Sequence, residues 1–160
     1  MTCEITHSEL KAVRQVITDT TARTFGMLSV IDETADSFVW LSENLRATTD
    51  WIEKKVRQIK SCESTSLIDP NNNFCTSLGL SQEKTSSFYR RLIRSREKPR
   101  FAINLERSKD MVSALSIALT QVADFYNATS NLRSAIIEHD ADLDSASGKR
   151  VLGLKIPLQD

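Results

Sequence analysis

Residues 8–60 read SELKAVRQVITDTTARTFGMLSVIDETADSFVWLSENLRATTDWIEKKVRQIK, and the spacing of apolar residues in this stretch decides the fold. One row recurs every seven residues and is apolar except at Thr24, and a second row lies between its members. The rows hold Leu10, Ile17, Thr24, Ile31, Phe38, Leu45, Ile52 and Ile59, and then Thr21, Leu28, Ala35, Ser42, Thr49 and Val56. Spacings that alternate between three and four residues form the heptad pattern of packed helices.

The heptad phase continues through Asp32-Glu33-Thr34, the best local candidate for a break. A turn between two helices usually resets this phase, so the pattern predicts one long helix from about Ser8 to about Lys60. At 1.5 Å per residue that helix would be roughly 75–80 Å long. The alternative is two helices, near 8–31 and 36–61, in a compact bundle.

The sequence changes character after residue 60. Serine, threonine and the turn-forming run Asp69-Pro70-Asn71 predict a loop over 61–80, either a plain surface connection or a phosphorylatable or partner-binding segment. Ser81 is a candidate N-cap for a short basic helix over about 81–97, and Pro99 marks its end.

A second heptad pattern predicts a long helix over about 101–140. Its seam holds Met111, Leu115, Ala118, Val122, Phe125, Thr129, Leu132, Ile136, His139 and Leu143. Residues 145–160 leave this periodicity but remain apolar, so we expect a non-helical tail. The tail either folds back on the bundle or docks as a strand on a partner.

Composition supports an all-α fold in one domain over residues 1–160. Glycine and proline number only 4 and 3, too few for a turn-rich β fold. We therefore expect an elongated antiparallel helical bundle with coiled-coil-like long helices and a short basic helix in the connector. The 21 basic and 21 acidic residues balance, which excludes a globally basic nucleic-acid binder but not a local basic patch.

Targeting and catalytic signals are absent from the sequence. No apolar leader or membrane-spanning run is visible, and the sparse cysteines Cys3, Cys62 and Cys75 suggest reduced thiols, so we expect a cytoplasmic protein. The sequence has no phosphate-binding loop, nucleophile elbow or metal-ligand spacing. We therefore expect a protein that is not an enzyme and that binds no cofactor, metal or small-molecule substrate.

Two features of the first seam suggest a protein contact. Thr24, Ser42 and Thr49 occupy seam positions where a leucine or isoleucine would bury more apolar area, so the seam is thin. Trp40 and Trp51 lie about 20° apart on a second helix face. Either another helix of the chain covers the tryptophans, or all five residues contact a partner protein.

The segment 84–100 is strongly basic, with Lys84 and six further cations against one Glu97. Aromatic and aliphatic residues alternate with them, a pattern suited to phosphates or anionic lipid. The candidate anion-binding residues are Arg90, Arg91, Arg94, Arg96, Lys98 and Arg100. The alternative is charge complementarity with the acidic residues of the two long helices.

These observations lead to two expectations about function. The first is a non-enzymatic structural or adaptor subunit that binds protein partners, or a second copy of itself, through heptad helix faces. The second is a peripheral module that binds an anionic membrane or nucleic acid through segment 84–100.

Overall fold

The computed structural model describes residues 5–30, 34–62, 74–96 and 105–140, without the side chains of 27–30, 96 and 105–109. The described residues form four helices and no strand, which confirms the all-α prediction. The helices are α1 (His7–Val30), α2 (Ala35–Lys60), α3 (Phe74–Arg96) and α4 (Leu105–His139). The predicted tail 145–160 and the turn at Asp69-Pro70-Asn71 lie outside the described residues.

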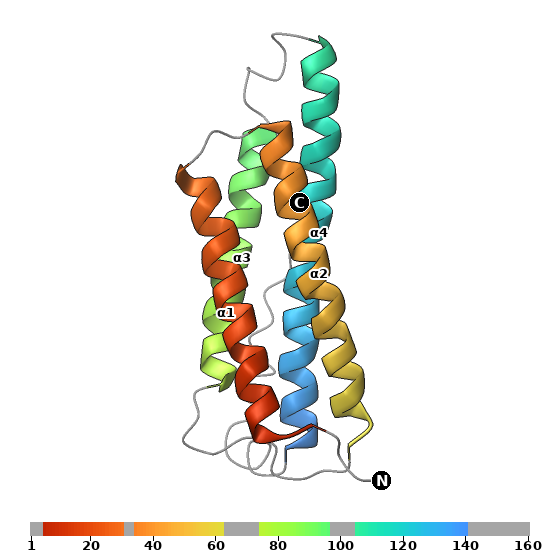
Figure 1. Ribbon diagram of the computed structural model, residues 1–160. Helices are drawn as coiled ribbons and strands as arrows, with labels where there is room; N and C mark the ends of the chain where they lie inside the picture. Colours follow the sequence, from red (N-terminus) through yellow and green to blue (C-terminus); the bar gives the residue numbers. More distant parts are fainter. Residues whose placement is uncertain (1–4, 31–33, 63–73, 97–104, 141–160) are drawn as a thin grey trace.

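The prediction of one helix over 8–60 is wrong. The chain forms α1 and α2, which lie side by side (Figure 1) and match the alternative of two helices near 8–31 and 36–61. Thr20 Oγ1 lies 3.4 Å from Thr48 Oγ1, a contact that a continuous helix cannot make. The first sixty residues therefore form a helical hairpin.

Capping chemistry at Thr34 is the local reason for the break. Thr34 has an extended backbone, with φ −124° and ψ 164°, and its Oγ1 accepts a hydrogen bond of 3.2 Å from the Ser37 backbone N–H. Asp36 places a negative charge in the first turn of α2, where the helix dipole favours it. Asp32 and Glu33 lie outside the described residues.

The start of α1 uses a reciprocal version of the same chemistry. The Glu9 backbone N–H donates to Thr6 Oγ1 at 3.1 Å, and the Thr6 N–H donates to Glu9 Oε2 at 3.4 Å. This is a capping box, in which two otherwise unpaired backbone donors are satisfied. The pattern Thr-x-x-Glu at residues 6–9 is visible in the sequence and fixes the helix start just before His7.

The basic helix is longer than the sequence pattern predicted. Helix α3 begins at Phe74, not at Ser81, so the last seven residues of the predicted 61–80 loop are helical. Phe74 and Leu78 are fully buried and extend the apolar face by two turns. Ser81 is therefore a buried residue inside the helix and not its N-cap.

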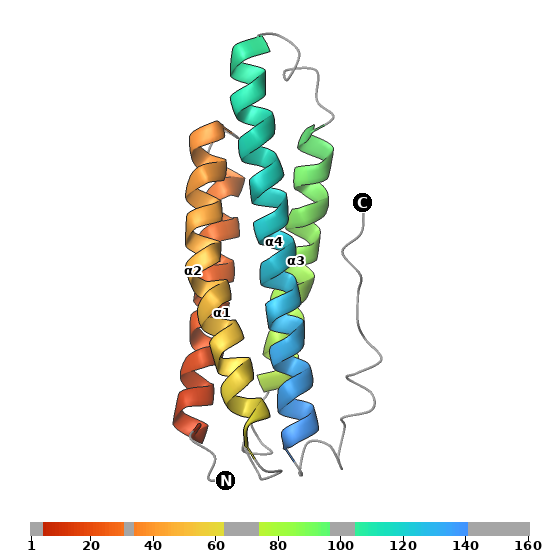
Figure 2. The same ribbon diagram turned by 90° about the vertical axis from the view of Figure 1, so that its right-hand side faces the viewer.

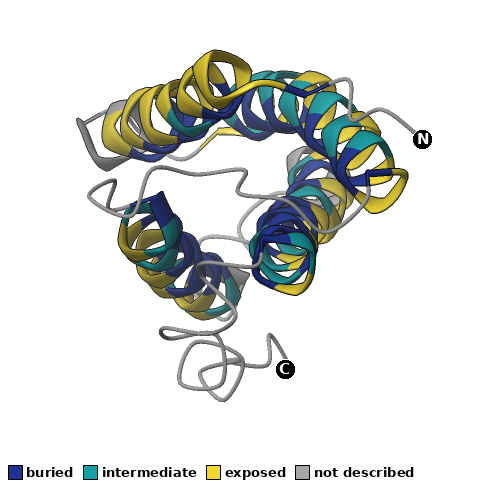
Figure 3. Cartoon of the chain, turned by 90° about the horizontal axis from the view of Figure 1, so that it is seen from below, coloured by how far each residue is buried: buried dark blue, intermediate teal, exposed yellow. Residues whose placement is uncertain are grey.

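Successive helices run in alternating directions, so α2 and α4 run the same way (Figures 1 and 2). Helix α4 therefore runs antiparallel to α1 and parallel to α2, because α3 returns the chain along the bundle. Helix α1 packs on α2 and α3, and α4 packs on the same two helices. The buried sides of all four helices face a shared core (Figure 3).

Both predicted seams lie in that core. Every member of the first row whose side chain is described is buried, including Leu10, Phe38 and Ile59. Most of the α4 seam is buried as well, from Leu115 to Ile136. The phase of the two rows matches across the break because α1 and α2 bury their stripes against the same core, not because the helix continues.

Hydroxyl groups in the core are mostly satisfied within their own helices. Thr21, Ser42 and Thr129 each donate a hydrogen bond of 2.7–2.9 Å to the carbonyl four residues earlier. This pattern lets a small polar residue occupy a seam without an unpaired donor. Three buried hydroxyls find no hydrogen-bond partner among the described residues, and these belong to Thr24, Thr49 and Ser86.

The cysteines only partly match the expectation of reduced thiols. Cys75 is a free thiol, whereas Cys62 is disulfide-bonded, which corrects the expectation at that position. Counting isolated cysteines in a sequence does not reveal which of them approach each other. Across the described helices, none is long and apolar enough to cross a membrane.

Candidate functional site

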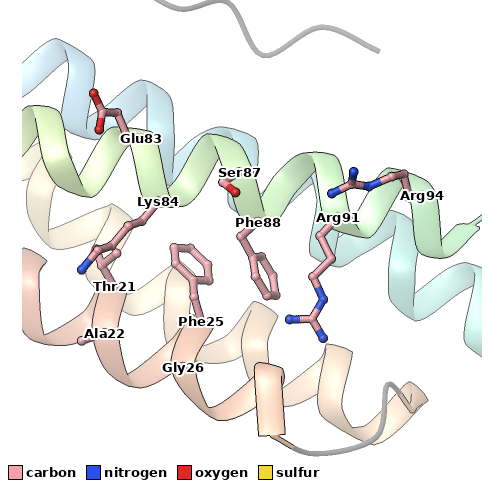
Figure 4. A pocket seen from close by; sticks show the side chains of 10 residues that line it. All are labelled: Thr21, Ala22, Phe25, Gly26, Glu83, Lys84, Ser87, Phe88, Arg91 and Arg94. Carbon is pink, nitrogen blue, oxygen red and sulfur yellow. The ribbon is translucent and has the colours of Figure 1, made fainter.

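A groove about 660 Å³ in volume lies between α1 and α3 (Figure 4). Ligand sites in proteins commonly measure about 300–1,000 Å³. We call it the α1–α3 groove, and its lining residues are Thr21, Ala22, Phe25, Gly26, Glu83, Lys84, Ser87, Phe88, Arg91 and Arg94.

Two stacked phenyl rings form the floor of the groove. The ring centroids of Phe25 and Phe88 lie 4.5 Å apart with an interplanar angle of 24°. Phe125 of α4 meets Phe25 edge to face at 6.3 Å and ties the floor to the core. Because the rings are held from three helices, the floor is a rigid part of the bundle.

Gly26 keeps the α1 side of the groove open. A Cβ atom added at Gly26 would meet no described atom within 4 Å beyond its own helix backbone and chain neighbours. Within an α-helix glycine costs about 1 kcal/mol relative to alanine. A methyl group at this position would therefore meet none of the described atoms.

Two cations flank the aromatic floor. Lys84 and Arg91 reach from α3 toward α1, on either side of the Phe25 and Phe88 rings (Figure 4). The Arg91 guanidinium carbon lies 5.7 Å from the Phe88 ring centroid, which is the geometry of a cation–π contact. This contact restrains the arginine next to the floor, while Lys84 keeps a longer, exposed reach.

Among the described residues that line the groove, cations outnumber carboxylates. Lys84, Arg91 and Arg94 lie there with one carboxylate, Glu83, which points away from α1 (Figure 4). The two phenyl rings are themselves buried, with exposed fractions of 8% for Phe25 and 6% for Phe88. No cluster of three or more metal-ligating side chains occurs within the described ranges.

The structure brings together only part of the predicted basic site. Arg91 and Arg94 line the groove, whereas Arg90 is exposed on α3 away from it. The side chain of Arg96 and the whole of Lys98 and Arg100 lie outside the described residues.

The predicted partner-binding residues are distributed differently. Thr24, Ser42 and Thr49 are buried inside the chain, with exposed fractions of at most 4%. Trp40 and Trp51 are half-buried and pack against the core. A role of all five in binding a partner stays a prediction.

A second polar cluster joins α3 to α4. Arg133 donates a hydrogen bond of 2.9 Å from Nη1 to Gln82 Oε1, and its guanidinium packs over Gly79. Burial raises the pKa of the nearby Cys75 thiol; the charge of Arg133 lowers it, and that of Asp140 raises it. The cluster fastens two helices and contains a protonated thiol, which is a poor nucleophile.

The sequence pattern placed Lys84 in the basic segment but did not single out Phe25. The two residues line one groove only because α1 and α3 are neighbours in the fold. The groove must be interpreted from its own geometry, because no protein-family model, curated protein or solved structure matches this chain.

Proposed function

We propose that the chain is a non-enzymatic adaptor subunit that binds a negatively charged protein partner through the α1–α3 groove. The observation that carries the proposal is the placement of Lys84 and Arg91 on either side of the Phe25–Phe88 floor. Charges of one sign around the groove provide a field that steers a negatively charged partner toward it.

The groove is a better candidate contact than the heptad faces. The described heptad residues already hold the four helices of the chain together, and Thr24, Ser42 and Thr49 have almost no exposed surface. A partner that used these residues would have to open the bundle. The groove is reached without any rearrangement.

We also propose that the bundle is elongated, that its helices pack like those of a coiled coil, and that neighbouring helices run antiparallel. An elongated bundle with coiled-coil-like packing is supported by helices of 24, 26, 23 and 35 residues and by the buried heptad rows. Antiparallel neighbours are the pairs α1–α2 and α3–α4. A homo-oligomer is supported by the exposed apolar residues of the described helices, which are Val16, Val39, Leu80, Val112 and Ile117.

A cytoplasmic location remains a prediction. The observation that bears on it is the disulfide at Cys62, and disulfides persist mainly in oxidising compartments. The groove's chemistry does not depend on the compartment.

Calorimetric titration of the purified chain with poly-L-glutamate tests the proposal. We expect binding that weakens steeply as salt rises from about 50 to about 200 mM, because screening acts on exposed charges. The double variant Lys84→Glu with Arg91→Glu should lose this binding. The matched control is Lys54→Glu with Arg90→Glu, which changes the net charge equally at two exposed positions outside the groove.

Anionic vesicles and duplex RNA or DNA form the other arms of the experiment. Binding to vesicles or nucleic acid that is lost in both double variants, without binding to poly-L-glutamate, would replace the adaptor proposal by the peripheral-module alternative. Equal binding of poly-L-glutamate by both double variants would refute the groove as the contact.

A further inference from the structure

Two opposite sides of the bundle differ in charge. Helices α1 and α4 each pack on both α2 and α3, so the four helices form a ring in the order α1, α2, α4 and α3. Figure 2 shows α2 and α4 in front of α1 and α3. The α1–α3 side, which holds the groove, therefore lies opposite the α2–α4 side, and a partner on one side leaves the other exposed.

Val39 and Asp124 mark the outer face of the α2–α4 side. Thr48 of α2 contacts α1, and Arg133 of α4 contacts α3. Val39 and Asp124 each precede one of these two contact residues by nine positions, which is half a revolution around a helix of about 3.6 residues per turn. They therefore point away from α1 and α3, on the side that α2 and α4 share.

Carboxylates outnumber cations on this outer face, which we call the α2–α4 face. Its exposed carboxylates, within about 40° of Val39 or Asp124 around their helices, are Glu43, Asp50, Glu53, Asp110, Asp124 and Glu138. Two described cations, Arg46 and Arg57, lie among them. Within the described part of the chain, none of these carboxylates forms an ion pair. Val39 and Ile117 add apolar surface to the face, with exposed fractions of 47% and 50%.

The α1–α3 side carries the opposite sign. Lys84 and Arg94 line the groove, are exposed, and form no ion pair with any described carboxylate. Lys11 is exposed on the same side of α1 as the groove residue Ala22, because eleven residues complete about three turns. Leu80, one turn before Lys84, is 55% exposed and gives this side an open apolar contact.

We propose that the negatively charged partner of the α1–α3 side is a second copy of this chain, bound through its α2–α4 face. This inference rests on the proposed adaptor function and specifies its partner. The contact joins two different faces, so each bound copy still presents one free face of each kind. Such heterologous contacts build rings or open rows larger than a dimer.

Charge complementarity supports a second copy as the occupant. The exposed cations of one side meet exposed carboxylates of the other, and both sides also carry exposed aliphatic side chains, Leu80 against Val39 and Ile117. The 21 basic and 21 acidic residues of the whole chain balance, so two copies do not repel each other through net charge. The opposite signs then orient the copies as they approach.

Sedimentation velocity of the purified full chain, over a wide range of concentration, tests the inference. We expect the average mass to rise with concentration and to pass the mass of a dimer. Raising the salt from about 0.1 M to about 1 M shortens the Debye length from about 10 Å to about 3 Å, so the average mass should fall back toward that of the monomer.

Charge reversal on either face should break the contact. The double variant Lys84→Glu with Arg94→Glu changes the α1–α3 side, and Asp50→Lys with Asp124→Lys changes the α2–α4 face. Each should weaken self-association at least about tenfold, because like charges then oppose each other across the interface. All four positions are exposed, and circular dichroism of each variant should show the helical content of the unmodified chain.

Each double variant has a control with the same net charge. Lys54→Glu with Arg90→Glu matches the first, and Asp19→Lys with Glu83→Lys matches the second. These four positions are exposed, and the substitutions leave the opposing charges of the two faces in place. Both controls should retain self-association.

The outcomes separate this inference from the adaptor proposal. A chain that stays monomeric at every concentration and salt would overturn the second copy as partner, and the poly-L-glutamate titration would still decide the adaptor proposal by itself. Loss of association in the Lys84, Arg94 variant but not in the Asp50, Asp124 variant would overturn the α2–α4 face as the occupant. Equal loss in the face variants and in their controls would overturn the pairing of these two faces.

Discussion

The hydroxyl of Thr24 shows how a single atom can limit the stability of this bundle. The side chain is completely buried, and Oγ1 has no hydrogen-bond partner in the described part of the chain. A buried polar group without a partner costs about 1–3 kcal/mol in protein mutation data. Three residues earlier, Thr21 is equally enclosed but donates to the Ile17 carbonyl at 2.7 Å.

We expect Thr24→Val to raise the free energy of unfolding by about 1 kcal/mol, because the change removes an unpaired hydroxyl and keeps the branched shape. Thr21→Val is the matched control, and we expect no gain there because a satisfied donor is lost. Urea unfolding followed by circular dichroism measures both. A larger gain for Thr21→Val than for Thr24→Val would contradict this view of the seam.

The Cys75 thiol gives a prediction about pH. Burial raises its pKa, with Arg133 lowering it and Asp140 raising it. In the unfolded chain a cysteine ionises near pH 8.5. The folded state therefore holds the proton more tightly, and this contribution to stability is complete below about pH 8.5 and is lost as pH rises through the folded-state pKa.

The free energy of unfolding of the unmodified chain should consequently fall more steeply between about pH 7.5 and pH 10 than that of Cys75→Ala. Urea unfolding without reductant, at a series of pH values, gives the two slopes. The comparison cancels lysine and tyrosine titration, which both chains share. Parallel slopes would show that Cys75 titrates alike in the folded and unfolded chain.

At the scale of the helix, the cap at Thr34 separates α1 from α2. Its hydroxyl accepts from the Ser37 N–H at 3.2 Å and lies 2.9 Å from the Ser37 Oγ. We expect Thr34→Ala to lower the free energy of unfolding by about 0.5–2 kcal/mol, the usual cost of losing an N-cap. Thr34→Asp should retain most of the stability because aspartate also caps well.

The control for the cap is Thr120→Ala. Thr120 is an exposed residue in the middle of α4. Its hydroxyl donates a hydrogen bond of 3.2 Å to the Ser116 carbonyl of the same helix. We expect a change within about 0.5 kcal/mol there. If Thr34→Ala costs no more than Thr120→Ala, the start of α2 is set by packing and not by the cap.

The sequence predicted which segments are helical better than it predicted where each helix begins and ends. Most of the predicted heptad positions in α1, α2 and α4 are buried, because the apolar stripe is what a helix packs with. The boundaries depended on single capping residues: Thr34 was weaker as a signal than the continuous heptad phase, and Ser81 resembled a cap although it lies inside α3. The start of α3 at Phe74 was hidden by neighbouring turn-forming residues.

At the scale of the whole molecule, neighbour relations could not be predicted. The groove requires that α1 and α3 lie side by side, and nothing within either segment specifies that choice. Phe25 and Phe88 are separated by more than sixty residues and meet at 4.5 Å only in the folded bundle. The sequence therefore predicted the basic residues that α3 contributes to the candidate site. It did not predict which residues of α1 would lie beside them.

The folded-back arrangement of α1 and α2 is the feature on which the groove depends, since a straight helix over 8–60 would carry the α1 wall away from α3. Spin labels at the exposed positions Gln15 and Glu53 test it. In a continuous helix the two sites would be about 57 Å apart at 1.5 Å per residue. In the hairpin they lie at similar heights on neighbouring helices, because Thr20 meets Thr48.

Double electron–electron resonance on the doubly labelled chain should therefore give one short distance, set by helix axes about 8–10 Å apart and by the two label arms. Dilution with unlabelled chain removes contributions from contacts between molecules. A distribution centred near the long distance would show that the chain opens into a rod in solution. In that state Phe25 could not stack on Phe88, and the α1–α3 groove would not exist.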